Sequence, residues 1–269
     1  MRTRLLINIC PNDSAMVRLE NITFSYPASP PIFKDFNWEV ERGETWSILG
    51  PSGCGKSTLL YLLAGLRFPS DGKIWINEQP LTRPRPYTGL IIQEYGLLPW
   101  ATVRQNAKLG LRIREFYGPD GTHAPVDHQN QVNVEYWLER LQLLPHAEKY
   151  PAQLSGGQRQ RTAIARTLAL KPDLLLMDEP FSSLDAPTRE GLQNLTLELQ
   201  SEEKLTLIVV THAIEEAAIL GEKILLLGQP PNTSLRVFEN PSFRLPDFRD
   251  TTDYFDLCQE LRQKMGGER

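Results

Sequence analysis

One stretch of the sequence decides the fold: Gly50-Pro51-Ser52-Gly53-Cys54-Gly55-Lys56-Ser57-Thr58. It fits the pattern G-x-x-x-x-G-K-[ST], follows an apolar run at residues 45–49, and precedes leucines spaced along one helix face, Leu59, Leu62, Leu63 and Leu66. Strand, glycine-rich turn and helix in this order are the setting in which such a turn binds phosphate. Glycines let backbone N–H groups surround an anion, and the helix N-terminus attracts it through its dipole. The stretch therefore predicts a nucleoside triphosphate site.

Two carboxylates form a second part of the expected site. Asp178 and Glu179 follow the apolar run 174–177, at the carboxyl end of an expected strand, and open α/β sheets bind ligands at that edge. We expect Ser57 and Asp178 to hold Mg²⁺ and Lys56 to reach the β- and γ-phosphates. Glu179 would polarise the attacking water, and the sequence fits either a general base or a residue that only positions this water.

Apolar strands alternate with helices along most of the chain, which predicts a mostly parallel sheet covered on both faces. Strands are expected at 17–24, 37–40, 45–49, 73–76, 89–92, 174–178, 206–210 and 224–227. Helices are expected at 103–111, 132–144 and 157–170; a further helix includes residues 192–199, and a short one begins at residue 213. We expect an N-terminal extension at 1–16, a helical segment at about 95–160, and a helical tail at 241–269. The tail is expected to pack on the body of the protein, because its apolar residues share helical spacing.

Composition narrows the classes of protein that fit. The 269 residues carry a formal net charge of −4, whereas nucleic-acid binders usually show a basic excess. Three scattered cysteines do not suggest a disulfide framework and favour a reducing compartment. No stretch approaches the roughly 20 apolar residues that span a bilayer. We expect a cytoplasmic protein that does not bind nucleic acid.

The stretch Leu154-Ser155-Gly156-Gly157-Gln158-Arg159-Gln160-Arg161 resembles the signature motif of ATP-binding cassette (ABC) ATPases. The resemblance runs from about residue 17 to residue 238 and implies an α/β fold. In this fold a P-loop NTPase (RecA-like) core carries an N-terminal antiparallel β subdomain and an inserted α-helical subdomain. It also implies a head-to-tail dimer, in which Ser155, Gly156 and Gly157 close on ATP held by the other subunit's P-loop. A Ser-Gly-Gly turn is also typical of a helix N-cap, and both roles are compatible.

The resemblance assigns four further site residues. Tyr26 resembles the aromatic residue that stacks on adenine. Gln93 resembles the glutamine that contacts Mg²⁺ or the lytic water. Asp185, in Ser183-Leu184-Asp185, matches the loop that crosses the dimer interface, and His212 resembles the histidine that contacts the γ-phosphate. Cys54 is interpreted as a small spacer in the P-loop whose alkylation should obstruct ATP.

Residues after Gln93 are most similar to importers of nitrate, sulfonate, taurine or pyrimidine precursors, which carry a Leu-Leu-Pro-Trp segment there. This implies a separate transmembrane permease, indirectly a substrate-binding protein, and a location on the inner face of the cell membrane. Leu97, Leu98 and Trp100 would either contact the permease or pack the helical subdomain. Alternatives are an exporter, lipoprotein-release or other cell-envelope complex, a soluble ABC ATPase acting on DNA or ribosomes, and a P-loop kinase.

Overall fold

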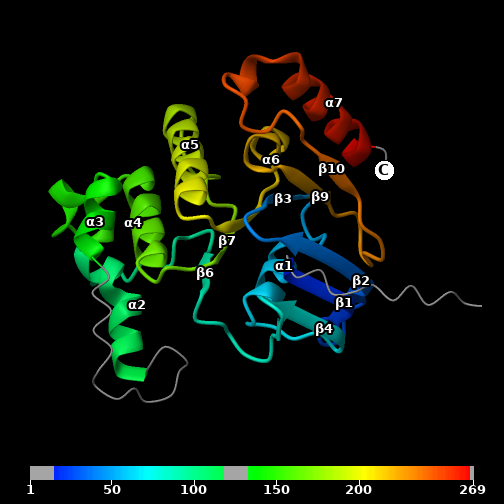
Figure 1. Ribbon diagram of the computed structural model, residues 1–269, viewed down its shortest axis with the longest axis horizontal. Coiled ribbons are helices and arrows are strands. Elements are labelled where there is room, and N and C mark those ends of the chain that lie inside the picture. Colours follow the sequence, from blue (N-terminus) through cyan, green and yellow to red (C-terminus); the bar gives the residue numbers. More distant parts are fainter. Residues whose placement is uncertain (1–14, 118–132, 267–269) are drawn as a thin grey trace, which may run out of the picture.

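The computed structural model describes residues 15–117 and 133–266, and two sheets organise them (Figure 1). The first sheet is antiparallel, in the order β2-β1-β4-β5. The second has the order β10-β9-β3-β8-β7-β6 and is parallel except for β10. The expected N-terminal antiparallel subdomain and mostly parallel core are therefore both present. Their strands are β1 (Ala15–Ser25), β2 (Pro31–Glu41), β3 (Thr45–Leu49), β4 (Asp71–Ile76), β5 (Gln79–Pro80), β6 (Thr88–Ile91), β7 (Leu174–Asp178), β8 (Thr206–Val210), β9 (Lys223–Leu226) and β10 (Val237–Glu239).

Both faces of the core sheet are buried, which explains the unbroken apolar runs in its strands. Successive residues of a strand point to opposite faces. Leu175 and Met177 pack with the helices on one face, whereas Leu174 and Leu176 pack with the antiparallel sheet and α1 on the other. A shift of one residue in register would exchange these sets, so two apolar cores fix the position of β7.

The helices are α1 (Lys56–Leu63), α2 (Val103–Tyr117), α3 (Val134–Arg140), α4 (Gly156–Leu168), α5 (Ala186–Glu202), α6 (Ile214–Leu220) and α7 (Thr252–Gly266), with short 3₁₀ turns at Leu144–His146, Pro151–Gln153 and Phe248–Asp250. Helices α2, α3 and α4 gather on the side of the core sheet away from β1, β2 and β4 (Figure 1). They form the helical subdomain that the sequence predicted. No helix in the described ranges is long and apolar enough to cross a bilayer.

Several expected boundaries differ from the structure. Strand β2 begins at Pro31 and not near residue 37, and α2 extends to Tyr117, beyond residue 111. Helix α1 ends at Leu63, and Gly65 follows with a φ of 69°, so Leu66 is 52% exposed and does not continue the buried face. The helix expected at 132–144 is only α3, followed by a 3₁₀ turn that contains Pro145. Strand β1 begins at Ala15 and so includes the last two residues of the expected extension, whose first 14 residues lie outside the described ranges.

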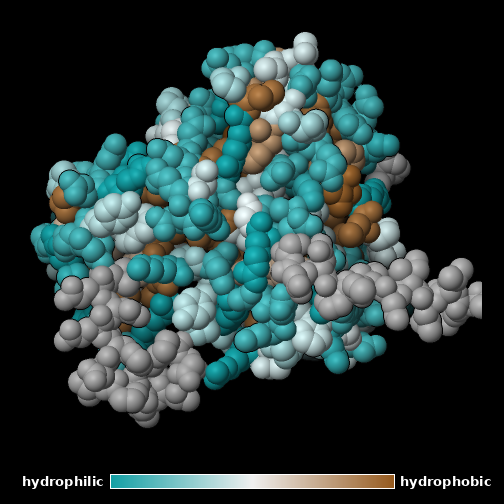
Figure 2. Space-filling view, in the orientation of Figure 1, coloured by the Kyte–Doolittle hydropathy of each residue, from teal (hydrophilic) through white to brown (hydrophobic). Residues whose placement is uncertain are grey.

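The C-terminal helix α7 packs on the core sheet, as expected. Cys258 and Leu261 are buried, and Leu261 lies in a cluster with Leu49 and Ile224. On the face shown in Figure 2, hydrophobic side chains appear in separate groups among hydrophilic ones. Much of the surface of a folded protein is contributed by apolar atoms, so small hydrophobic groups of this kind are normal.

Candidate functional site

Four segments that carry predicted site residues follow four neighbouring strands. The P-loop follows β3, His212 follows β8, Asp178 ends β7, and Gln93 follows β6, in the sheet order β3-β8-β7-β6. Because these strands are parallel, all four segments emerge at the same carboxyl edge. The topology therefore brings together residues that are far apart in the sequence.

The P-loop turns tightly at Gly55. This residue has a φ of 108°, and a Cβ there would lie 2.4 Å from Ile32 Cγ2, so only glycine fits. The Lys56 side chain is 7% exposed and its Nζ donates to the carbonyl oxygens of Gly50 at 2.7 Å and Pro51 at 3.0 Å. The ammonium group is therefore held inside the loop that would surround the phosphates.

Ser57 and Asp178 meet beside this loop. The Ser57 hydroxyl donates to Asp178 Oδ1 at 3.1 Å. Asp178 is 5% exposed, and burial raises the pKa of its carboxyl. A hydroxyl and a carboxylate are hard oxygen donors of the kind that Mg²⁺ accepts together with substrate phosphates. In the described residues no cluster of three or more His, Cys, Asp or Glu forms another candidate metal site.

Glu179 is the meeting point of two other predicted residues. His212 Nδ1 lies 3.2 Å from Glu179 Oε2, and Gln93 Nε2 donates to the same oxygen at 3.3 Å. Glu179 has a φ of 45°, which is uncommon for a residue with a Cβ. Its amide donates to Val210 O at 2.9 Å, so β8 fixes its backbone. The structure thus assembles Gln93, Glu179 and His212 as one group.

Tyr26 lies against the helix that begins in the P-loop. Its hydroxyl is 3.4 Å from Thr58 Oγ1, and its half-buried ring contacts Phe24 edge-on at 5.2 Å between centroids. The Arg67 guanidinium carbon lies 6.0 Å from the Tyr26 ring centroid. The tyrosine is therefore next to the expected nucleotide site, and its stacking on adenine stays a prediction.

Ser155 caps α4 through a capping box. Its hydroxyl accepts from the Gln158 amide at 3.3 Å, and Gln158 Oε1 accepts from the Ser155 amide at 3.0 Å. A Cβ on Gly156 would lie 2.9 Å from Leu184 Cδ2, and one on Gly157 would lie 2.6 Å from Thr188 Cγ2. Both glycines therefore allow close packing against the segment that begins α5, and a larger residue would displace the side chain of Leu184 or Thr188.

Asp185 caps α5. Its carboxylate accepts from the Thr188 amide at 3.2 Å, and hydrogen bonds from Thr188 lower the pKa of the Asp185 carboxyl. None of the hydrogen bonds described for Ser155 or Asp185 reaches the P-loop of the same chain. These two predicted residues are not brought to the Lys56 site within one subunit, and Ser155 and Asp185 are exposed.

Two residues that hold the site together, Tyr95 and Arg166, were not predicted. The Tyr95 hydroxyl is 2.8 Å from Ser183 Oγ, and Arg166 donates to the carbonyls of Tyr95 at 2.8 Å and Gly96 at 2.6 Å. Burial lowers the pKa of the Arg166 guanidinium. These contacts tie the segment after Gln93 to α4 and to the segment before α5. The sequence offered no signal for Tyr95 beyond its place two residues after Gln93.

The structure shows how far the side chains of Cys54 and of Leu97, Leu98 and Trp100 are exposed. The Cys54 side chain is fully buried in the core cluster beneath the P-loop, so alkylation of the folded loop is not a route to blocking ATP. Trp100 is 73% exposed, but Leu97 and Leu98 are only partly exposed, and Leu97 packs against the core. Trp100 is therefore the one residue of that trio with a largely free side chain.

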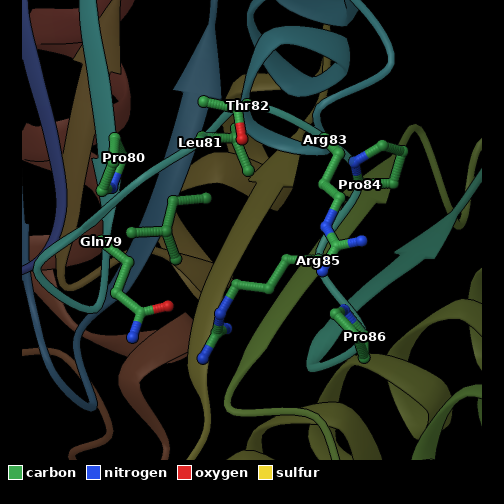
Figure 3. A pocket seen from close by; sticks show the side chains of 9 residues that line it. Gln79, Pro80, Leu81, Thr82, Arg83, Pro84, Arg85 and Pro86 are labelled. Carbon is green, nitrogen blue, oxygen red and sulfur yellow. The ribbon is translucent and has the colours of Figure 1, made fainter. Parts of the chain in front are cut away.

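A pocket of about 350 Å³ lies elsewhere, between the antiparallel sheet and the start of β6. Figure 3 shows Arg83 and Arg85 among Pro80, Pro84 and Pro86 in its lining. Arg85 forms a bidentate ion pair with Asp173. None of the residues that line this pocket belongs to the predicted site, so the pocket is not the nucleotide site.

A protein-family model described as "ABC transporter" matches residues 33–182. The aliphatic sulfonates import ATP-binding protein SsuB of Bacillus cereus is 38% identical over 234 residues, which cover 87% of this chain and 86% of that protein. The nitrate import ATP-binding protein NrtD of Synechococcus elongatus is 38% identical over 221 residues, covering 81% and 78%. The bicarbonate transport ATP-binding protein CmpC of the same organism is 40% identical over 228 residues, covering 82% of this chain and 33% of that protein.

Solved structures with the same fold include cbiO1 of Clostridium perfringens, described as part of the ABC transporter complex cbiONQ. It has a TM-score of 0.71 and 26% identity and covers 85% of this chain and 90% of that chain. A dimeric post-hydrolysis state of the ATP-binding cassette MJ0796, bound to ADP and Pi, has a TM-score of 0.68 and 31% identity. It covers 85% of this chain and 100% of that chain.

Proposed function

The chain belongs to the ABC transporter family, and from that membership we propose that it is the ATP-hydrolysing subunit of an importer for a small oxyanion. The relatives named above are ATP-binding proteins for the import or transport of sulfonates, nitrate and bicarbonate. These solutes share an anionic group with three oxygens on one central atom. Solute selectivity would belong to a separate permease and a substrate-binding protein, and this chain would act at the inner face of the membrane.

The observation that carries the ATPase proposal is the convergence of Gln93 and His212 on one oxygen of Glu179. These three residues lie at the same carboxyl edge of the sheet as Ser57 and Asp178, the residues that would hold Mg²⁺. When bound, Mg²⁺ neutralises charge on the phosphates and orients them. Lys56, already inside the P-loop, would contact the β- and γ-phosphates.

Glu179 would accept a hydrogen bond from the attacking water. Its side chain is 21% exposed, so water can reach it, and it lies at the sheet edge where the γ-phosphate would bind. Gln93 and His212 hold the carboxylate in place and leave it as an acceptor. In-line attack on the γ-phosphate then needs little more from the protein than position and charge.

Two copies of the chain would be needed for a complete site. Ser155 and Asp185 are exposed and cap helices away from the P-loop of their own subunit, and the related cassette MJ0796 is described as dimeric. In a head-to-tail dimer the α4 N-terminus of one copy would meet the γ-phosphate bound by the other. N–H groups at a helix start are suited to an anion.

The permease contact would lie on the helical subdomain. Trp100 is 73% exposed just before α2, while Leu97 packs inward and fixes the segment that carries it. Tryptophan is among the residues that most often anchor protein interfaces, and Trp100 is the most exposed large hydrophobic residue of the described ranges. We therefore assign the anchoring contact with the permease to Trp100.

A pull-down from native membranes tests this function. Tagged Glu179→Gln protein would be captured with ATP in mild detergent, and Lys56→Ala protein, which should bind ATP weakly, would serve as the matched control. Recovery of a multi-span permease by the first variant and much less by the second supports the proposal. Recovery of ribosomes, DNA or no membrane protein would contradict the importer, while ATP hydrolysis by the unmodified chain tests the enzyme separately.

A further inference from the structure

Asn232 lies between β9 and β10, outside the range that the family model matches, and its side chain reaches the P-loop. It is 7% exposed, and its Nδ2 donates to the carbonyl oxygen of Cys54 at 2.9 Å. The same nitrogen donates to Ile32 O at 3.3 Å, and Oδ1 accepts from the Gly228 amide at 3.0 Å. Every hydrogen of this buried amide group therefore has a partner.

The orientation of the Asn232 amide is determined by its partners. The Cys54 and Ile32 carbonyls can only accept, and the Gly228 N–H can only donate, so a flipped amide would face three mismatched groups. The backbone is fixed as well, because Asn232 N donates to Ile32 O at 2.8 Å and Lys34 N donates to Asn232 O at 3.0 Å. Asn232 is thus a rigid support for whatever it contacts.

What it contacts is the peptide that joins Cys54 to Gly55. In a trans peptide the C=O and the following N–H point in opposite directions. By holding the Cys54 carbonyl toward the core, Asn232 turns the Gly55 N–H away from the core, where a P-loop presents its N–H groups to phosphate. Ile32 presses on the same residue, since a Cβ on Gly55 would lie 2.4 Å from Ile32 Cγ2.

We propose that Asn232 is a positioning residue for ATP binding, which sets the Cys54–Gly55 peptide so that the P-loop is formed before the nucleotide arrives. Preorganisation of this kind raises affinity by removing an ordering cost from the binding step. The proposal rests on the nucleotide site of the proposed function and is independent of the transported solute. Asn232 does not contact Glu179, Gln93 or His212, so it should act on binding and leave the chemical step unchanged.

The test compares Asn232→Ala with Asn240→Ala. Asn240 is a matched control because it is 3% exposed and its Nδ2 donates to two backbone carbonyls, Ala218 O at 2.8 Å and Gly221 O at 2.9 Å, remote from the P-loop. Both variants should lower the thermal midpoint without nucleotide, because both leave buried carbonyls unpaired. Only Asn232→Ala should also weaken binding of a fluorescent ATP analogue, by about tenfold, with kcat at saturating ATP changed less than about twofold.

Asn232→Asp keeps the proposal testable if the alanine variant does not fold. Aspartate has nearly the same shape and still accepts from Gly228, but it cannot donate to Cys54 O. We expect a larger loss of affinity for the analogue than the alanine variant shows. Unchanged affinity in folded Asn232 variants, or equal loss in Asn240→Ala, would overturn the proposal. Failure of the unmodified protein to bind ATP would contradict the proposed function itself. Normal binding by the unmodified protein together with unchanged affinity in the Asn232 variants would contradict only the role of Asn232.

Discussion

Gln93 and His212, which come from two distant segments of the chain, both contact Glu179 Oε2. The backbone of Glu179 is also fixed, because its amide donates to the Val210 carbonyl of β8. The site is therefore organised around a carboxylate that is held and still reachable from solvent. Changes at this residue should separate binding from chemistry.

Glu179→Gln should bind ATP with little change and hydrolyse it at least about a hundredfold more slowly, because a neutral amide can neither take a proton from the attacking water nor orient that water as strongly as a carboxylate. Its size allows the contacts with Gln93 and His212 to persist after an amide flip. Phosphate release and analogue binding would be measured side by side. Glu190→Gln, an exposed carboxylate on α5, is the control, and near-normal turnover in Glu179→Gln would remove Glu179 from the catalytic role.

Tyr26→Ala should weaken ATP binding by about tenfold if the ring stacks on adenine, since a stacked base contributes about 1–3 kcal/mol. Tyr26→Phe keeps the ring and loses only the hydroxyl that lies near Thr58 Oγ1. It should bind nearly as tightly as the unmodified protein. Titration with ATP and with tripolyphosphate tests the assignment, because tripolyphosphate has no base and its affinity should be equal in all three proteins.

At the scale of elements, two helices that begin near the expected dimer surface are capped by the residues proposed to act across it. Ser155 caps α4 and Asp185 caps α5. A cap satisfies backbone N–H groups that the first turn leaves unpaired. The same side chains therefore contribute to folding and to the proposed function, so both stability and activity have to be measured for their variants.

Ser155→Ala should lower the free energy of unfolding by about 1 kcal/mol, because the Gln158 amide loses its acceptor. Urea unfolding of the isolated subunit measures this. Binding of ATP to one subunit should be unaffected, since Ser155 makes no described contact with its own P-loop. A stability equal to that of the unmodified protein would mean that the cap contributes nothing in solution.

The stabilising effect of Asp185 should disappear in acid. Hydrogen bonds from Thr188 lower the pKa of Asp185 in the folded state, so the unfolded chain binds the proton more readily. The contribution is complete above the unfolded value of about 3.9 and is lost as the pH falls toward the lower folded value. The difference in unfolding free energy between Asp185→Asn and the unmodified protein should therefore be constant well above a pH of about 3.9 and should shrink as the pH falls below it, and a difference that stays constant in acid would contradict the assignment.

The sequence predicted the elements whose patterns are local. The runs in β3, β7 and β8 are apolar throughout because both faces of the sheet are buried, and those strands were predicted at their observed residues. Leu66 was misplaced because Gly65 ends the helix early, which periodicity does not reveal. The pairs Tyr95–Ser183 and Asn232–Cys54 could not be predicted, because 88 and 178 residues separate their members and only the folded sheet brings them together.

At the scale of the whole molecule, one chain carries two half-sites that lie in different subdomains. The P-loop and Glu179 follow the carboxyl edge of the core sheet, and the α4 start is exposed in the helical subdomain. A symmetric pair of copies can unite each half with its counterpart. Hydrolysis should therefore depend on protein concentration.

Mixing two inactive variants tests the head-to-tail arrangement. Lys56→Ala lacks a working P-loop, and Ser155→Arg blocks the α4 start with a bulky cation. Each should be inactive alone, whereas an equal mixture should recover about a quarter of the normal rate, because half of the dimers are mixed and each holds one intact site of two. ATPase activity of Ser155→Arg alone, or none in the mixture, would contradict the arrangement.

The capping box at Ser155 limits which residues can occupy that position. A hydroxyl has two lone pairs and one hydrogen, so it can accept from the Gln158 amide and at the same time donate to a phosphate oxygen. Aspartate would cap the helix equally well but would repel the phosphate, and alanine would serve neither need. A substitution survey at this position should therefore tolerate threonine and reject nearly everything else, even though the side chain is exposed and an inspection of burial alone would class the position as permissive.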